Sequence, residues 1–282
     1  MNLEQFPRLR EALDYGYEFR IGHYFQQGFD LLKKNLGGFI GYTLLYLAII
    51  TVLGIIPIIG NIASFILTPP LAVGWFIVAN KLHKNVPTEF GDFFKGFDYI
   101  GQLILIYIIS ILIYIAIMSP AIIVGVSFIY NITSRLELDT GVPTSLIITM
   151  LVITIPLIYL GVAWRWAPMF VVFHNMSFWD AMEASRKIVT KRWFSHFIMM
   201  LLIGLTFIAS GFLFIGGIIS AGVTDTLEIF SSTVVLVGLL LFMAASLMIL
   251  PFYQCVEYAA FANITKLTSP DSVDDIVDHL IA

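Results

Sequence analysis

The sequence predicts an all-α fold, a polytopic bundle of six transmembrane helices. Hydrophobic residues make up 59% of the 282 residues and charged residues only 12%, whereas soluble domains carry about 25% charged residues to wet their surface. Several long stretches have no charged residue, and Lys and Arg gather in alternate loops between them. The surplus apolar surface therefore requires a bilayer as its solvent, with the charge-free stretches as the spans.

The first charge-free stretch runs from Asn35 to Asn80. It is too long for one crossing of a core of roughly 30 Å at about 1.5 Å per residue. The segment Pro57-Ile-Ile-Gly-Asn61 is typical of a tight turn, so the stretch predicts a hairpin of two spans, 37–56 and 62–82. Pro69 and Pro70 remove two amide donors and should kink the second span.

The second stretch, 99–134, would overshoot a bilayer as one helix. Ser119-Pro120 is the expected break, which leaves a third span at 99–118 and an interfacial or protruding extension at 121–131. The remaining spans are expected at 144–164, which contains Pro156, at 194–219 and at 231–256.

Basic residues predict the orientation. Thirteen lie on one side of the predicted spans, whereas Arg135 lies on the other and Arg165 at the end of the fourth span. This asymmetry places both termini in the cytoplasm, and the expected location is an inner membrane. No cleaved signal peptide is expected at the start. The thirteen are Arg8, Arg10, Arg20, Lys33, Lys34, Lys81, Lys84, Lys95, Arg186, Lys187, Lys191, Arg192 and Lys266.

Three amphipathic segments precede spans and are predicted to form helices lying along the membrane: 20–36, 88–98 and 177–192. The third opens with Ser177-Phe-Trp-Asp180, which resembles a capping box. The spacing suggests a threefold repeat of amphipathic helix, span, turn and second span, in which each second span passes a proline near its end. The alternative is that proline and Asn collect at helix ends in any case.

Three motifs carry a resemblance to a known group. They are Gly28-Phe-Asp-Leu-Leu-Lys-Lys-Asn35, then Pro70-Leu with Lys81-Leu and Phe90-Gly-Asp-Phe-Phe-Lys-Gly-Phe97, and Phe178-Trp-Asp-Ala-Met-Glu-Ala-Ser185-Arg-Lys. With its hydropathy profile, the chain resembles uncharacterised bacterial six-span proteins, which include the membrane domain attached to some glycerophosphodiester phosphodiesterases. The resemblance implies a helical membrane domain, and it implies no catalytic residue, because that group has no established common reaction.

The predicted organisation has three parts: an interfacial N-terminal segment over 1–36, the transmembrane domain over 37–262, and an acidic cytoplasmic tail over 263–282. The tail could be a short amphipathic helix, a partner peptide or a solvated terminus.

Glu257 is the strongest candidate for a functional group, because a carboxylate at membrane depth is costly and is usually paired. We expect a polar site of Glu257, Gln254 and Gln102, with Arg165 as a partner of Glu257. Two alternatives stay open. Glu257 could lie at headgroup level and reach water or a lysine. Arg165, between Trp164 and Trp166, has the pattern of an interfacial anchor, although phosphate binding is also open.

A non-enzymatic protein that organises lipids or partner proteins is the function the sequence favours. Arg186, Lys187, Lys191 and Arg192 are its expected contacts with anionic lipid. A small-molecule transporter is the alternative, supported by the proline-interrupted spans. No nucleophile–base pair or metal-ligand spacing supports an intramembrane enzyme, so no cofactor, metal or nucleic-acid partner is expected.

Overall fold

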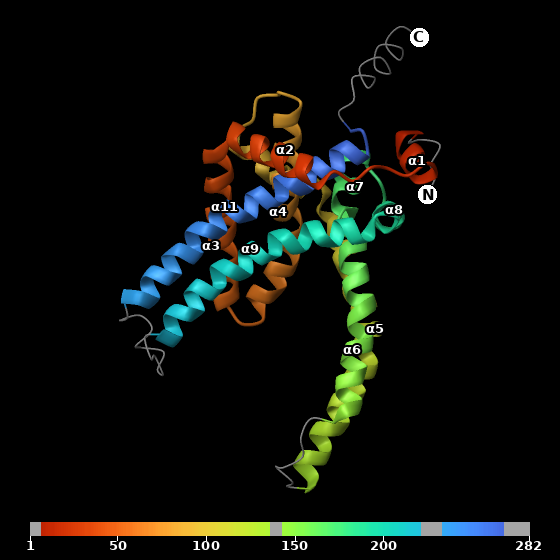
Figure 1. Ribbon diagram of the computed structural model, residues 1–282, viewed down its shortest axis with the longest axis vertical. Coiled ribbons are helices and arrows are strands. Elements are labelled where there is room, and N and C mark those ends of the chain that lie inside the picture. The colour runs from red at the N-terminus through yellow and green to blue at the C-terminus, as the bar shows by residue number, and fades with distance from the viewer. Residues whose placement is uncertain (1–6, 136–142, 221–232, 268–282) are drawn as a thin grey trace. The chain divides into compact units, whose positions relative to one another are not determined.

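The computed structural model describes residues 7–135, 143–220 and 233–267 of the chain. Throughout these ranges the secondary structure is helical, without a strand. The elements are α1 (Pro7–Asp14), α2 (Ile21–Lys34), α3 (Leu36–Ile55), α4 (Ile59–His83), η2 (Phe90–Tyr99), α5 (Ile100–Arg135), α6 (Thr144–Ala163), α7 (Ala167–His174), α8 (Phe178–Lys191), α9 (Trp193–Ser220) and α11 (Thr233–Ile264) (Figure 1). The acidic tail beyond residue 267 lies outside the described residues.

Six of these helical segments are long and apolar enough to cross a membrane. The predicted first hairpin is confirmed, since α3 and α4 begin and end within three residues of the expected bounds. The sixth span is longer than predicted, because α11 continues through Pro251 to Ile264. The chain is therefore a multi-pass integral membrane protein.

The predicted break at Pro120 is wrong. Helix α5 runs without interruption from Ile100 to Arg135 with Pro120 inside it. A proline cannot donate to the carbonyl four residues before it, which here belongs to Ala116. The hydroxyl of Ser119 donates to that carbonyl at 2.8 Å. Ser119, which belongs to the predicted break, therefore supplies the missing donor, as Ser does in membrane helices.

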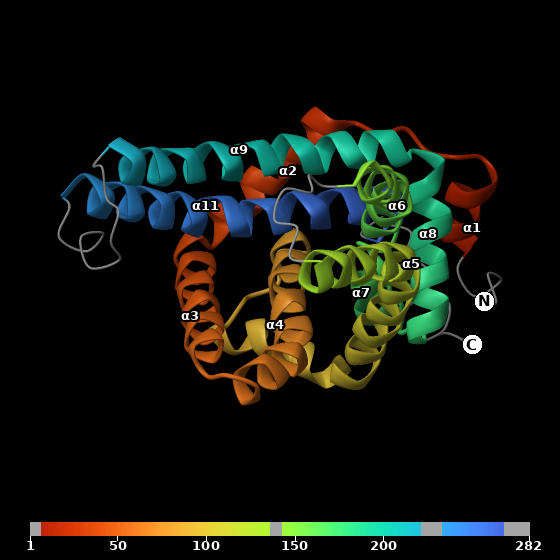
Figure 2. The ribbon, with the colours of Figure 1, turned by 90° about the horizontal axis from the view of Figure 1, so that it is seen from below.

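The chain divides into two compact units, each described by itself. Unit 1 holds residues 101–193, and unit 2 holds residues 2–100 with 194–282. In unit 2, α3 and α4 form one hairpin, and α9 and α11 lie side by side (Figures 1 and 2).

In unit 2, the amphipathic helix α2 packs on the second half of α11. A Cβ added to Gly28 would come within 2.6 Å of Val256 Cγ2 and 2.8 Å of its backbone nitrogen. Only glycine allows the two helix backbones to approach this closely. Phe25 and Phe29 on the same face both meet Phe252, with ring centroids 5.8 Å and 6.4 Å apart.

Also in unit 2, η2 packs on α4 through a buried carboxylate. Asp92 is 3% exposed and accepts a hydrogen bond from Lys81 Nζ at 2.7 Å, and Lys95 Nζ lies 2.9 Å from its other oxygen. It also accepts from the backbone of Glu89, which closes a capping box at the start of η2. Phe93, fully buried, stacks on Tyr42 of α3 at 4.4 Å.

Each amphipathic helix packs part of its apolar stripe against the protein itself, while Phe29, Phe90 and Trp179 stay exposed. Their expected position along the membrane surface stays a prediction. Helix α2 packs on α11, η2 on α4, and α8 on α7. In each case the partner is the closing part of a span that follows a proline, namely Pro251, Pro70 or Pro168. The order of elements follows the suggested repeat. Helices η2 and α8 each pack on the second span of the hairpin that precedes them in the chain, and α2 packs on the last span, α11.

Candidate functional site

The fourth span of unit 1 is interrupted between α6 and α7. Residues Trp164 to Trp166 form a turn, and α7 restarts with Pro168 in its first turn. Ser185 of α8 bridges the gap: its hydroxyl donates to Ala163 O at 2.6 Å and accepts from Trp166 N at 3.2 Å. The two backbone groups freed by the interruption are therefore satisfied inside the protein, as an apolar environment requires.

Trp166 has no exposed surface. This finding corrects one part of the interfacial-anchor interpretation of Trp164-Arg165-Trp166, because a belt tryptophan keeps its ring at the membrane surface. The buried ring instead belongs to the core that α7 forms with α8. Trp164 is half-buried, and its ring lies 6.0 Å from that of Tyr114 on α5.

Helix α8 is fixed at both ends. At its start, Ser177 accepts from Asp180 N, which confirms the predicted cap, and Gln102 Oε1 of α5 accepts from Phe178 N at 2.8 Å. At its end, the Thr190 hydroxyl lies 2.9 Å from the Tyr159 hydroxyl of α6. Gln102, predicted to belong to an intramembrane polar site, is therefore a capping residue of α8 in this structure.

The apolar face of α8 is buried, so its basic residues lie on the opposite face. Ala181, Met182, Ile188 and Val189 are all at most 3% exposed. Of the four predicted lipid contacts, Lys187 and Lys191 are exposed on α8, Arg186 is half-buried, and Arg192 is exposed directly after the helix ends. We call these four residues the basic face of α8.

One carboxylate partly neutralises this basic face. Glu183 Oε1 lies 2.8 Å from Arg186 and 3.3 Å from Lys187. Hydrogen bonding from Arg186 lowers the pKa of Glu183, and the bond with Glu183 raises the pKa of Arg186. Glu183 is thus charged at neutral pH and lies against Arg186 and Lys187, whereas Lys191 and Arg192 are exposed at the end of α8 and just beyond it.

A groove of about 450 Å³ lies between α5 and the α6–α7 interruption in unit 1. Helix α5 contributes Ile106, Ser110 and Tyr114 among others, and the opposite wall contains Gly161, Trp164 and Arg165. The lining is largely apolar and aromatic, and Arg165 is its one charged residue.

Glu257 is 2% exposed and lies in α11 of unit 2, between the buried residues Val256 and Tyr258. A carboxylate that reaches bulk water would be more exposed, so the water-exposed form of the alternative is not supported, and contact with a lysine stays open. Gln254, one turn earlier, is half-buried. Arg165 and Gln102 belong to unit 1, so their grouping with Glu257 stays a prediction. Beside Glu257, Tyr258 donates to Asn80 Oδ1 at 2.9 Å and lies 3.3 Å from His83 Nδ1.

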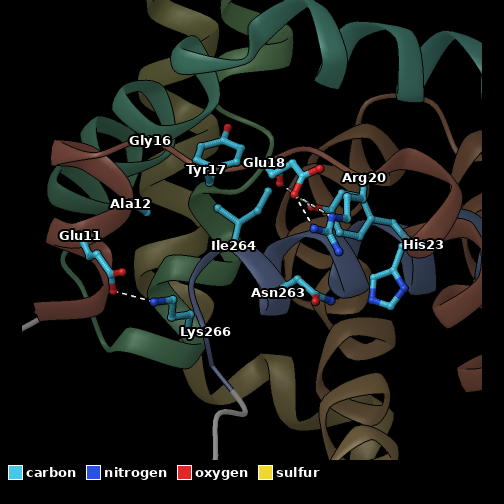
Figure 3. A pocket seen from close by; sticks show the side chains of 11 residues that line it. Glu11, Ala12, Gly16, Tyr17, Glu18, Arg20, His23, Asn263, Ile264 and Lys266 are labelled. Carbon is cyan, nitrogen blue, oxygen red and sulfur yellow. Dashed lines mark hydrogen bonds and ion pairs between the residues drawn. The ribbon is translucent and has the colours of Figure 1, made fainter.

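Unit 2 has a more polar pocket of about 320 Å³ where α1 and α2 meet the end of α11 (Figure 3). Its charged side chains face one another in pairs: Lys266 Nζ lies 2.6 Å from Glu11, and Arg20 lies 2.5 Å from Glu18. Their charges are therefore already compensated by each other.

No family model, curated protein or solved structure matches this chain. Among the residues that the structure describes, no group of three His, Cys, Asp or Glu side chains could hold a metal ion.

Sequence reasoning missed the roles of Ser185 and Lys81. Ser185 belongs to the third resemblance motif, but nothing in that motif indicates that its hydroxyl bonds the backbone of an interrupted span. The pairing of Lys81 with Asp92 was predictable. Glu89 and Asp92 have the spacing of a capping box, and a capping-box carboxylate that is buried needs a cation nearby.

Proposed function

We propose that this integral membrane protein is not an enzyme and that it organises anionic lipid at the cytoplasmic surface of a bacterial inner membrane. One observation carries the proposal: α8 is anchored into a span by Ser185 and presents its basic face away from the protein. A helix held in this way keeps its cations in place, so lipid headgroups bind without the cost of ordering a flexible segment.

The strength of the expected interaction follows from the exposed cations. Each Lys or Arg close to an anionic membrane surface contributes about 1 kcal/mol of attraction. Lys191 and Arg192 are exposed, whereas Arg186 and Lys187 share Glu183. Replacing the first two with Gln should therefore weaken binding of anionic lipid about 10- to 30-fold and should leave the Glu183 pairs intact.

The test is the composition of lipid retained by the purified protein. The Lys191→Gln/Arg192→Gln variant and wild type are extracted from the same membrane, and retained phosphatidylglycerol and phosphatidylethanolamine are quantified by mass spectrometry. The matched control is Lys33→Gln/Lys84→Gln, which removes two exposed lysines from unit 2. An equal ratio of the two lipids in all three proteins, and again after Arg186 and Lys187 are also replaced, would refute the proposal.

A small-molecule transporter is the alternative, and the interruption between α6 and α7 is its main support. Transporters bind substrate with the backbone groups that an interrupted helix leaves free. In this chain Ser185 already bonds Ala163 O and Trp166 N. Neither the α5–α6 groove nor the pocket of Figure 3 is lined by Glu257 or Gln102. The geometry therefore favours lipid binding.

The resemblance to the six-span group that includes phosphodiesterase membrane domains is kept as a proposal on the three motifs quoted above. Those motifs lie at the contacts that hold the amphipathic helices: Gly28 on α11, Phe93 against α3, and Ser185 on α6 and α7. This placement supports a shared architecture and gives no support for a shared chemical reaction.

A further inference from the structure

We propose that the hairpin of α3 and α4 does not reach the opposite surface of the membrane, and that its tip, residues 55–62, ends inside the hydrocarbon core against acyl chains. The proposal concerns unit 2 and does not depend on the basic face of α8, so its failure would leave the proposed lipid function as it stands. A hairpin enters and leaves the membrane on the same side whether or not it crosses, so the proposed position of the termini is unaffected.

The tip has the composition of a surface that faces lipid. Ile55, Ile58 and Ile59 are 74%, 73% and 71% exposed. In water such a group of isoleucines would cost hydrophobic free energy, which contact with acyl chains removes. The turns of the other two hairpins carry charged residues in the sequence, namely Arg135, Glu137 and Asp139 after α5, and Asp225 and Glu228 after α9. The first hairpin has no charged residue between Asn35 and Asn80.

The turn at the tip satisfies its own backbone donors. Ile56 N donates to Leu53 O at 3.2 Å, and Gly60 N donates to Ile56 O at 3.1 Å. Ile59 N donates to Pro57 O at 2.7 Å, and Pro57 itself has no amide hydrogen. The closure is this tight because residue 60 is glycine, since a Cβ there would overlap Leu53 O. Hydrocarbon offers a backbone amide no partner, and this turn needs none for these groups.

The part of the hairpin that extends beyond its protein contacts is short. Alongside its other end lies η2: a Cβ on Gly96 would overlap Pro70 O, and Tyr42 stacks on a ring of η2. Towards the tip, α4 has 11 residues from Pro70 to Ile59, and α3 has 13 from Tyr42 to Ile55. These stretches measure about 17 Å and about 20 Å at 1.5 Å per residue, whereas the hydrocarbon core is roughly 30 Å thick.

The charges of η2 indicate where the hydrocarbon begins on this side. Lys95 and Asp98 are exposed on η2, and exposed charges at membrane depth are costly, so η2 belongs at headgroup level. Exposure along α4 changes at the same level, from 1% at Trp75 to 58% at Ile62. With η2 at the surface, the tip ends roughly 10 Å short of the opposite edge of the core.

The first experiment measures the depth of the tip. A spin label is attached at Ile55→Cys in the Cys255→Ser background, with the full chain in nanodiscs of phosphatidylglycerol and phosphatidylcholine. Collisions with oxygen, which concentrates in the bilayer interior, are compared with collisions with a water-soluble nickel chelate. We expect oxygen to exceed nickel several-fold at this position, and the reverse at the control Lys84→Cys, which is exposed just beyond α4.

Two results of this measurement would overturn the proposal. An excess of nickel collisions at the tip would show that it reaches water, either at the opposite surface or across a thinned bilayer. Low collision rates with both reagents would show that protein, such as a second copy of the chain, covers the tip.

The second experiment adds a charge to the tip. Ile55→Asp should lower the midpoint of thermal unfolding in the same nanodiscs by about 5–10 °C, because a carboxylate within the core is costly. The matched control is Tyr15→Asp, at an aromatic position of unit 2 that is 89% exposed, and it should leave the midpoint unchanged. Asn61→Leu should leave the midpoint unchanged or raise it, since it removes an exposed amide from the tip. Equal midpoints for Ile55→Asp and Tyr15→Asp would place the tip in water.

Discussion

Ser185 donates its hydroxyl to the carbonyl of Ala163 at 2.6 Å, across the contact between α8 and the end of α6. The same oxygen accepts from Trp166 N on the far side of the helix interruption. One buried side chain therefore satisfies both ends of a broken span and fixes the helix that carries the basic face.

Ser185→Ala should destabilise the protein by about 2 kcal/mol, because it leaves a buried carbonyl and a buried amide without their partner. For a chain of this size we expect the midpoint of thermal unfolding in detergent to fall by about 5 °C. The control is Ser127→Ala, at an exposed position where the hydroxyl bonds Ile123 of its own helix. An unchanged midpoint for Ser185→Ala would mean that the bridge contributes nothing.

Gly28→Ala should separate α2 from α11, because the new methyl group would lie within 3 Å of the Val256 backbone. Overpacking of this kind costs about 1–3 kcal/mol. Gly22→Ala on the same helix has open space around its Cβ and should be neutral or stabilising by up to about 1 kcal/mol. Thermal unfolding of the two variants under one set of conditions tests the contrast, and a shift of the same sign in both would contradict the contact.

Asp92 lies in the charged segment η2, outside the apolar part of the third span. Burial acts to raise its pKa, but hydrogen bonds from Lys81, the Glu89 backbone and Lys95 outweigh burial and lower the pKa from 3.8 to about 2. A carboxyl with a lowered folded-state pKa contributes stability above its ordinary pKa and loses it as the pH falls through the folded value.

Asp92→Asn should therefore cost about 2–3 kcal/mol at pH 7. The difference in unfolding midpoint between wild type and Asp92→Asn should shrink as the pH falls from 4 towards 2. The control is Asp98→Asn, on the exposed part of η2. A difference that stays constant between pH 5 and pH 2.5 would show that the carboxylate charge is not what stabilises η2 on α4.

The proposed orientation can be tested with single cysteines. Cys255 is buried, and replacing it with Ser leaves a background without thiols. Lys84 directly follows α4 and Thr144 is the first residue of α6; both are exposed, and the proposed topology places them on opposite sides of the membrane. Lys84→Cys should react with a membrane-impermeant maleimide only after the cells are opened, whereas Thr144→Cys should react in intact cells. The reverse pattern of labelling would invert the proposed topology.

Several parts of the fold could be predicted from the sequence because they depend on local properties. The lack of charge between Asn35 and Asn80 requires lipid or a protein core around that stretch, and Pro57 indicates where it turns, although Gly60 and Asn61 already belong to α4. The cap at Ser177 was also predictable, since its hydroxyl acts on an amide three residues away. Pro120 shows where local reasoning ends: its effect depends on whether Ser119 turns its hydroxyl to Ala116, a choice of rotamer that the sequence does not display.

The order of the amino acids is enough to predict that the chain crosses a membrane, where its first hairpin lies and which helix carries the basic residues. Hydrophobic transfer acts on each segment separately, so these properties follow from composition and order. The packing of helices against one another is what makes Ser185 hold α8, Gln102 cap it, and Arg165 line a groove with Tyr114. Those relationships join residues 22 to 76 positions apart, and they exist only where packing brings two helices together.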